Sequence, residues 1–235
     1  MAYLSQNSTA IEGHAMPVIS FASPKGGSGK TTSAIILVCE LAQKADVIMI
    51  DADPAARSQE WSQRGKKHNR IEVISCSNED KIQDVIDDAA ARAPFVIVDM
   101  EGAATNLNSM VIGQSDLVII PTGDEQQDAT AALRAIRQVG QVGRTARREI
   151  PARVLFARTK AAVKARNAKD INTELRDAAP AFAVELNDRT AFSSLHSYGG
   201  TLYDLDGKVV GGLPRAIENS VAFASEVIEV LRGAK

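Results

Sequence analysis

The segment that most constrains the fold of this chain is residues 23–32, which read SPKGGSGKTT. It follows an apolar run of strand length, Val18 to Ala22, and it opens a longer run of helical period from residue 30 to residue 44. Glycines let the backbone curl so that successive N–H groups point at phosphate oxygens, and the N-terminus of the following helix adds a favourable dipole. The sequence therefore predicts a phosphate-binding loop between a strand and a helix, which requires an α/β fold.

The side chains of this loop have roles that follow from the chemistry of a nucleoside triphosphate. We expect Lys30 to reach the β- and γ-phosphates and the Thr31 hydroxyl to bind Mg²⁺, so ATP and Mg²⁺ are the predicted cofactors. The loop backbone supplies the other contacts, and the predicted nucleotide-binding set is Lys25, Gly26, Gly27, Ser28, Gly29, Lys30, Thr31 and Thr32.

Three carboxylates follow apolar runs of strand length. Asp51 and Asp53 come directly after the run Val47 to Ile50, and Asp99 ends the run Phe95 to Val98. Ligands of open parallel sheets bind at the carboxyl ends of the strands, so we expect all three carboxylates beside the phosphate loop. Four hydrophobic residues and an aspartate also match Walker B, where the carboxylate holds Mg²⁺ through water.

Strand-length apolar runs alternate with helical segments along the chain from Pro17 onwards. Runs that are apolar throughout predict strands covered on both faces, so the expected fold is a doubly wound, mostly parallel α/β sheet with helices on both faces. With 235 residues, 45% of them hydrophobic, we expect a single domain over residues 17–235 after a flexible N-terminal extension of residues 1–16. The predicted strands are 18–22, 47–50, 71–75, 95–98, 117–120 and 154–157, and the predicted helices are 30–44, 57–67, 78–93, 105–113, 125–142, 164–178, 189–198 and 214–232.

The pattern KGGSGKT, with a lysine at the start of the loop, resembles the deviant Walker A motif of the ParA/MinD family of P-loop ATPases. The resemblance implies that Lys25 reaches across a dimer interface to the nucleotide of the partner. It also implies that Asp53 orients or activates the hydrolytic water and that Asp51 supports Mg²⁺ through its water shell. The predicted catalytic residues are then Lys25, Lys30 and Asp53, and the predicted metal-site residues are Thr31, Asp51 and Asp99.

The similarity to this family extends from about Val18 to about Leu231 and is loose after Gly102. Where the family often continues with Pro and Gly after Walker B, this chain reads Met100-Glu101-Gly102. Gly102 can still act as the conformational pivot of a γ-phosphate sensor. Glu101 either acts on the hydrolytic water or faces solvent.

Later segments also resemble the family. Thr159 and Lys160 occupy a position where the family often contacts adenine, so both belong to the predicted nucleotide site. Residues 188–192 and 199–201 match its late arginine and glycine pattern.

A basic segment interrupts a chain whose formal net charge is only -2. Residues 134–169 contain eleven Lys or Arg and one acidic residue, Glu149. Such a segment is typical of a surface that binds phosphate backbones, and a solvated face is the other interpretation. The predicted contacts to non-specific DNA are Arg134, Arg137, Arg144, Arg147, Arg148, Lys160, Lys164, Arg166 and Lys169.

These features predict an ATP-dependent DNA partition ATPase that dimerises on MgATP, binds DNA without sequence preference and releases it after slow, partner-stimulated hydrolysis. The implied partners are a second copy of the chain, DNA and a ParB-like centromere-binding adaptor, with a cytoplasmic, nucleoid-associated location. A VirC-type ATPase of conjugative DNA processing and a MinD-like surface-positioning ATPase are the alternatives. Membrane docking is disfavoured because the polar face of residues 219–232 is acidic before Arg232.

Two other enzyme classes lack support in the sequence. A metabolic enzyme of the same superfamily needs a substrate pocket, and no segment identifies one. An electron-transfer ATPase needs paired cysteines to ligate a cluster between subunits. Cys39 and Cys76 have neither CxxC spacing nor neighbouring histidines, so we expect them to pack in the core.

Overall fold

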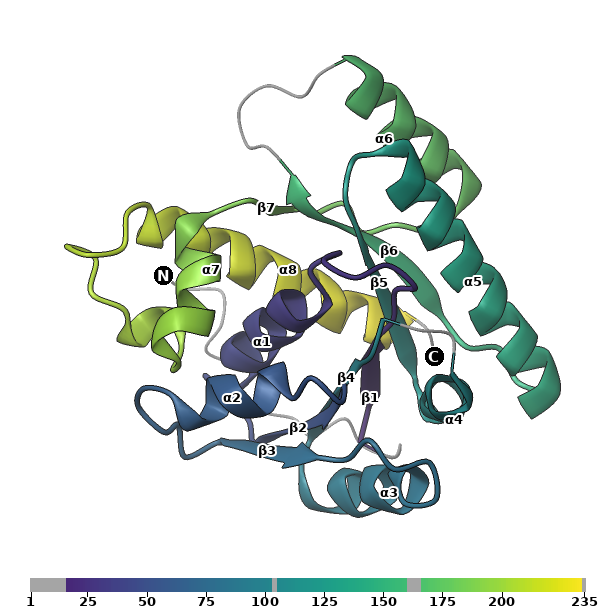
Figure 1. Cartoon of the computed structure of the whole chain (residues 1–235), viewed down its shortest axis with the longest axis horizontal. Coiled ribbons are helices and arrows are strands. Elements are labelled where there is room, and N and C mark those ends of the chain that lie inside the picture. The colour runs from purple at the N-terminus through teal and green to yellow at the C-terminus, as the bar shows by residue number, and fades with distance from the viewer. Residues whose placement is uncertain (1–15, 103–104, 160–165, 234–235) are drawn as a thin grey trace.

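The computed structural model describes residues 16–102, 105–159 and 166–233, and these residues form one parallel sheet with a layer of helices on each face (Figure 1). The strand order is β3-β2-β4-β1-β5-β6-β7, and every pairing is parallel. The predicted fold class is therefore confirmed. The strands are β1 (Val18–Phe21), β2 (Val47–Ala52), β3 (Ile71–Ser75), β4 (Phe95–Met100), β5 (Leu117–Thr122), β6 (Ala152–Thr159) and β7 (Leu186–Asn187).

The helices divide into two layers according to their mutual contacts. One layer contains α1 (Lys30–Leu41), α2 (Arg57–Gln63), α7 (Thr190–Tyr198) and α8 (Leu213–Gly233), with the short 3-10 helix η1 (Leu202–Asp204) beside them. The other contains α3 (Ile82–Arg92), α4 (Asn106–Gln114), α5 (Gln126–Ala146) and α6 (Arg166–Ala178). None of the described helices is long and apolar enough to cross a membrane.

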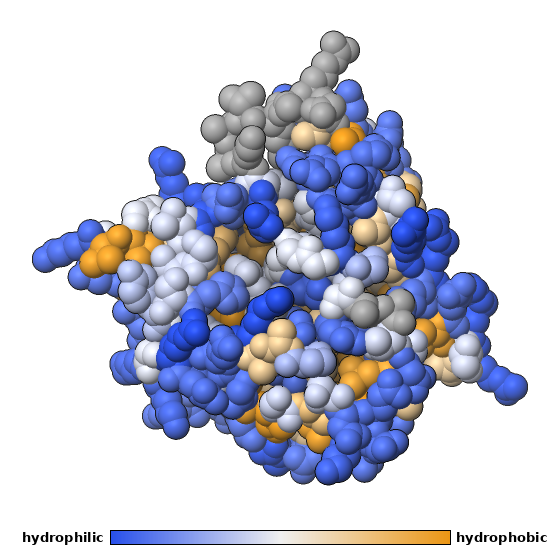
Figure 2. Space-filling view, in the orientation of Figure 1, coloured by the Kyte–Doolittle hydropathy of each residue, from blue (hydrophilic) through white to orange (hydrophobic). Residues whose placement is uncertain are grey.

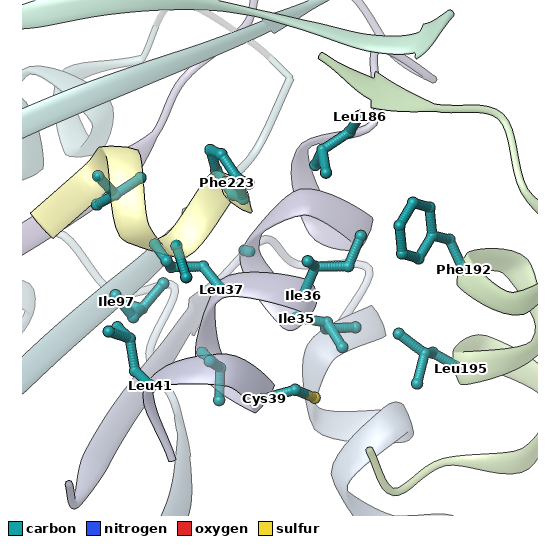
Figure 3. Close-up of a cluster of buried hydrophobic side chains, with 14 of the residues drawn as sticks. Ile35, Ile36, Leu37, Cys39, Leu41, Ile97, Leu186, Phe192, Leu195 and Phe223 are labelled. Carbon is teal, nitrogen blue, oxygen red and sulfur yellow. The ribbon is translucent and has the colours of Figure 1, made fainter. Parts of the chain in front are cut away.

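The inner strands send successive side chains to opposite layers, which explains why they are apolar at nearly every position. Ile19 and Ile97 join a cluster with α1, α7 and α8, whereas Val18 and Val96 join a second cluster with α3, α4 and α5. Figure 3 shows α1 at the centre of the first cluster, with Cys39 among its buried side chains. Cys39 and Cys76 are both buried and unpaired, as expected of core residues.

Several sequence predictions need correction. The run Ile71 to Ser75 is an edge strand whose side chains are partly or fully exposed, so it is not covered on both faces. The predicted helices 30–44, 57–67 and 78–93 are shorter in the structure, because their ends form turns or extended backbone. Strand β7 and helix η1 were not predicted, and residues 164–165 of the predicted sixth helix lie outside the described residues.

Candidate nucleotide-binding site

The phosphate loop joins the central strand β1 to helix α1, as predicted. Gly27 has a φ of 75° and Gly29, the residue that caps α1, has a φ of 94°. Both values lie in the left-handed region, which only glycine adopts without strain. A Cβ on Gly29 would also approach the Cβ of Ala157 to 3.3 Å. Both glycines are therefore required by backbone shape, and Gly29 also by the close approach of β6.

Lys30 is withdrawn from water at the base of this loop. The residue is only 8% exposed, and a Cβ added to Gly102 would lie 3.2 Å from its Nζ, so the ammonium packs against the backbone at the end of β4. Burial lowers the pKa of Lys30, while the carboxylates of Asp99 and Asp53 oppose the change. A cation held with so little solvent interacts strongly with an anion that enters the loop.

Asp99 is a carboxylate of the site that has no contact with solvent. It is fully buried, and the Ser58 hydroxyl donates a hydrogen bond of 2.8 Å to its Oδ2. Burial raises the pKa of Asp99 to about 6, because hydrogen bonding by the Ser58 and Thr31 hydroxyls offsets only part of the desolvation. Its Oδ1 has no hydrogen-bond partner among the described residues. A buried acceptor of this kind beside Thr31 suits the water shell of a Mg²⁺ ion, so these residues fit the metal.

Asp51 pairs with Asp99 in the register of β2 and β4, so the two carboxylates leave adjacent strands at the same level. Asp51 is fully buried and accepts the backbone N–H groups of Asp53, at 3.2 Å, and Gln59, at 2.8 Å. It therefore fixes the turn that leads into α2. Burial raises its pKa, and these two hydrogen bonds lower it less.

Asp53 lies in that turn with a side chain that is 15% exposed. Its carboxylate accepts the Ala55 N–H at 2.9 Å and stands 4.0 Å from Arg57. The water-activating role of Asp53 and the metal-supporting role of Asp51 stay predictions.

Lys25 contacts an acidic residue of its own chain. Its ammonium is hydrogen-bonded to Asp128 in the first turn of α5 and lies 3.8 Å from Glu125, the residue before that helix. The Asp128 side chain is only 12% exposed, and its hydrogen bond is the main reason that the pKa of Lys25 is raised. In this conformation Lys25 is therefore held within its own subunit.

Two further contacts involve predicted nucleotide-site residues, one between α1 and α7 and one between β6 and β7. The Thr32 hydroxyl lies 2.8 Å from Nε2 of His196, whose pKa is lowered by burial and, to a smaller extent, by Arg57 and Arg64. Thr159 is buried, and its hydroxyl accepts a 3.0 Å hydrogen bond from the Asn187 amide. Lys160, the other predicted adenine contact, lies outside the described residues.

The predicted DNA contacts fall on different elements. Arg134, Arg137 and Arg144 are exposed and, at spacings of three and seven residues, share one face of α5. Helix α5 continues to Ala146, so Arg144 lies in its last turn and not in the loop after it. Figure 2, which shows the molecule from the same side as Figure 1, shows a surface that is largely hydrophilic.

The remaining predicted contacts divide into two groups. Arg148 donates to the carbonyls of Gly113 and Ser115, at 2.9 and 2.7 Å, and so braces the segment before β5, while Arg147 forms the left-handed cap of α5. Lys169 is exposed on α6, the helix that begins at Arg166. Lys160 and Lys164 lie outside the described residues.

Four side chains that contact the site were not assigned from the sequence. They reach it from separate elements and belong to no spaced motif: Ser58, Asp128, Arg158 and His196. Ser58 and Asp128 had a usable signal, because each lies six residues after a strand that ends at the same edge of the sheet.

The chain is similar to known proteins over most of its length. The family model described as VirC1 protein matches residues 16–224. A protein ParA from Rhizobium radiobacter is 34% identical over 92% of this chain and 98% of its own, and a protein virC1 from the same organism is 26% identical over 92% and 96%. A putative plasmid partition protein from Borrelia burgdorferi B31, solved with AMPPNP, superposes with a TM-score of 0.69 at 17% identity and covers 91% of this chain and 99% of its own.

Replacement of Asp99 by Asn should stabilise the ligand-free protein at pH 8. The pKa of Asp99 is about 6 in the folded chain against an ordinary value of 3.8. Above pH 6 the buried ion destabilises the fold, by up to roughly 3 kcal/mol, and this destabilisation is lost as the pH falls through about 6 toward 4. Calorimetric melting without Mg²⁺ or nucleotide should therefore give Asp99→Asn a higher Tm than the parent at pH 8 and a smaller advantage at pH 5.

The exposed Asp46 provides the matched control, and Asp46→Asn should change the Tm little at either pH. An advantage of Asp99→Asn that is equal at pH 8 and pH 5 would contradict the buried-charge interpretation.

Proposed function

The chain belongs to the VirC1 protein family of ParA/MinD-type P-loop proteins, and we propose that it is an ATPase that positions DNA by an ATP-controlled dimer. The observation that carries this proposal is the phosphate loop with its buried cation. Lys30 lies beneath the loop with little solvent, and Asp99 offers an unpartnered oxygen beside Thr31. A relative of known structure is bound to AMPPNP, an ATP analogue, which supports the choice of nucleotide.

The residues of the site divide into two chemical roles. Lys30 and the loop N–H groups bind the β- and γ-phosphates, and Thr31, Asp51 and Asp99 hold a Mg²⁺ ion, which neutralises phosphate charge when bound. Asp53 lies in a polar turn beside them and can accept a hydrogen bond from the attacking water. Binding and water activation are thus assigned to different side chains.

This division predicts separable defects in two variants. Lys30→Ala should reduce ATP affinity by more than about a hundredfold, because it removes the buried charge under the phosphates. Asp53→Ala should bind ATP within about threefold of the parent and lose most of its turnover, because the phosphate-binding residues are kept while the attacking water loses its partner. Fluorescent-nucleotide titration and steady-state phosphate release measure the two quantities. Parent-like turnover by Asp53→Ala would remove that residue from the mechanism.

The dimer proposal rests on the position of Lys25 at the start of the loop. Its ammonium is bound to Asp128 of the same subunit, so it has to leave this partner before it can reach a nucleotide in a second subunit. When the dimer forms with ATP, the Lys25 ammonium therefore gives up the Asp128 carboxylate and contacts a phosphate of the partner's nucleotide instead. The in-cis ion pair therefore opposes the dimer.

Two substitutions should shift the ATP-dependent dimer in opposite directions. In an Asp53→Ala background that preserves ATP, Lys25→Ala should weaken the dimer, whereas Asp128→Asn should lower its dissociation constant roughly two- to fivefold because Lys25 is released. Light scattering over a concentration series measures both, and Glu125→Gln is the control because Glu125 is exposed and more distant. A protein that stays monomeric with ATP would exclude the role in trans, and an unchanged constant in Asp128→Asn would exclude the competition.

DNA is the proposed surface because α5 presents a row of exposed cations. Arg134, Arg137 and Arg144 lie on one helical face, and Lys169 is exposed on the neighbouring α6. Contacts of this kind reach phosphates and carry little sequence information. Two subunits double the number of phosphates that can be engaged, so affinity should depend on ATP. A nucleoid-associated location follows from the same property.

Neutralising the α5 row should weaken non-specific DNA binding and its salt dependence together. The change is Arg134, Arg137 and Arg144 to Gln, which spares Arg148 because that side chain braces the backbone. The slope of log K against log salt should flatten by up to about 0.9 for each lost phosphate contact, and ATP affinity should stay near that of the parent. Fluorescence anisotropy with an arbitrary duplex between 50 and 200 mM salt, with ATP and with ADP, measures the effect.

The charge-matched control replaces Lys44, Lys67 and Lys208 by Gln, three exposed lysines in the segments that follow α1, α2 and η1. An equal loss in this control, or equal binding with ATP and ADP, would place the DNA contacts elsewhere.

The VirC1 match favours a second candidate within the same chemistry, an ATPase of conjugative DNA processing. Partition stays first because the protein ParA shares more of its sequence with this chain than the virC1 protein does. A ParB-like adaptor that stimulates turnover belongs to the partition proposal. Stimulation of phosphate release by the product of a neighbouring adaptor gene distinguishes the two roles.

A further inference from the structure

Arg158 has a backbone conformation that its position in a strand does not explain. Its φ is 59°, in the left-handed region that side chains with a Cβ rarely adopt. The other described non-glycine residues with positive φ, Ala56 and Arg147, lie at helix ends, whereas Arg158 lies inside β6. Ala157 and Thr159 pair with the adjacent residues Leu186 and Asn187, so Arg158 is the extra residue of a β-bulge. Bulges of this kind re-aim a side chain, and the bulge turns this one out of the strand.

The side chain of Arg158 extends over the phosphate loop. Its Nη1 donates a hydrogen bond of 2.8 Å to the carbonyl oxygen of Gly27. Its Cγ and Cδ lie 3.8 and 3.9 Å from the position that a Cβ would take on Gly29. The guanidinium is therefore anchored to the loop glycines, although the residue as a whole is exposed.

This hydrogen bond fixes the orientation of one peptide group of the loop. The peptide that joins Gly27 to Ser28 is planar and trans, so its C=O and N–H point in opposite directions. Arg158 holds the carbonyl on its own side, and the Ser28 N–H is thereby directed to the other side. Phosphate-binding loops work by presenting successive N–H groups to the anion, and a flipped peptide would present a carbonyl instead.

We propose that Arg158 is a positioning residue for phosphate binding, which holds the Gly27 peptide so that the loop presents its N–H groups to a nucleoside di- or triphosphate. The inference rests on the proposed nucleotide site and adds a residue that no motif of the sequence assigns. It also gives the bulge in β6 a reason, because a regular strand would not direct position 158 at the loop.

Arg158→Gly is the informative variant. Glycine accepts a φ of 59° without strain, so the bulge is retained and the ligand-free protein should melt within a few degrees of the parent. Affinity for MgADP and MgATP, measured by titration calorimetry, should fall about tenfold or more, as expected for loss of a hydrogen bond from a charged donor. Arg158→Lys should recover part of the affinity, because an ammonium can still reach the Gly27 carbonyl. Arg153→Gly, on the same strand, is the control for loss of an arginine.

The outcomes separate this inference from the proposed function. If the parent binds nucleotide and Arg158→Gly binds equally well, or if affinity falls only together with the melting temperature of the ligand-free protein, the positioning role is wrong. If the parent itself does not bind MgADP or MgATP while it is fully folded, the proposed nucleotide function fails and the role of Arg158 with it.

Discussion

The structure depends on keeping charged groups out of water at one edge of the sheet. Lys30, Asp51 and Asp99 are all buried there, and for each of them burial shifts the pKa toward the neutral form. The attraction between Lys30 and Asp99 and the hydrogen bonds do not offset the desolvation, so the site destabilises the ligand-free chain. A fold can hold such groups only if its apolar core is large, and the two clusters on either face of the sheet supply that core. Helix α1 belongs both to the charged site and to the apolar core, because it begins at Lys30 and is buried along most of its length.

Much of the architecture could be predicted because its signals are local. Strands β1, β2, β4 and β5 are apolar at nearly every position because helices cover both of their faces. The closely spaced glycines of the phosphate loop likewise predict its tightly curled backbone. Strand β3 was grouped with them wrongly, since a strand of five residues with Glu72 at its second position has the composition of an edge strand. Strand β7 has two residues and carries no periodic signal at all.

The sequence predicted only those residues of the site that belong to a local motif or stand at the end of an apolar strand. Lys30, Asp51 and Asp99 follow from motif and strand end, and the sheet register then places the two carboxylates at one level. Asp128 and His196 reach the loop from helices that start about a hundred residues or more away along the chain. Their contacts depend on how the layers pack, which spacing does not encode. Arg148 shows the same limit, since the basic segment suggests a ligand surface but does not reveal that this side chain also binds two carbonyls of its own chain.

The contact between Lys25 and Asp128 has a consequence for the concentration at which subunits associate. A carboxylate tethered in the same molecule acts on the lysine at an effective concentration on the order of millimolar or higher, whatever the amount of protein present. Free subunits compete with it only in proportion to their own abundance. In the dimer that we propose, Asp128 sets a threshold: at low copy number Lys25 stays with the internal carboxylate, and it changes partner only where many nucleotide-loaded subunits gather on one surface. Under the proposed function, crowding along DNA, rather than nucleotide alone, then decides when the two subunits join.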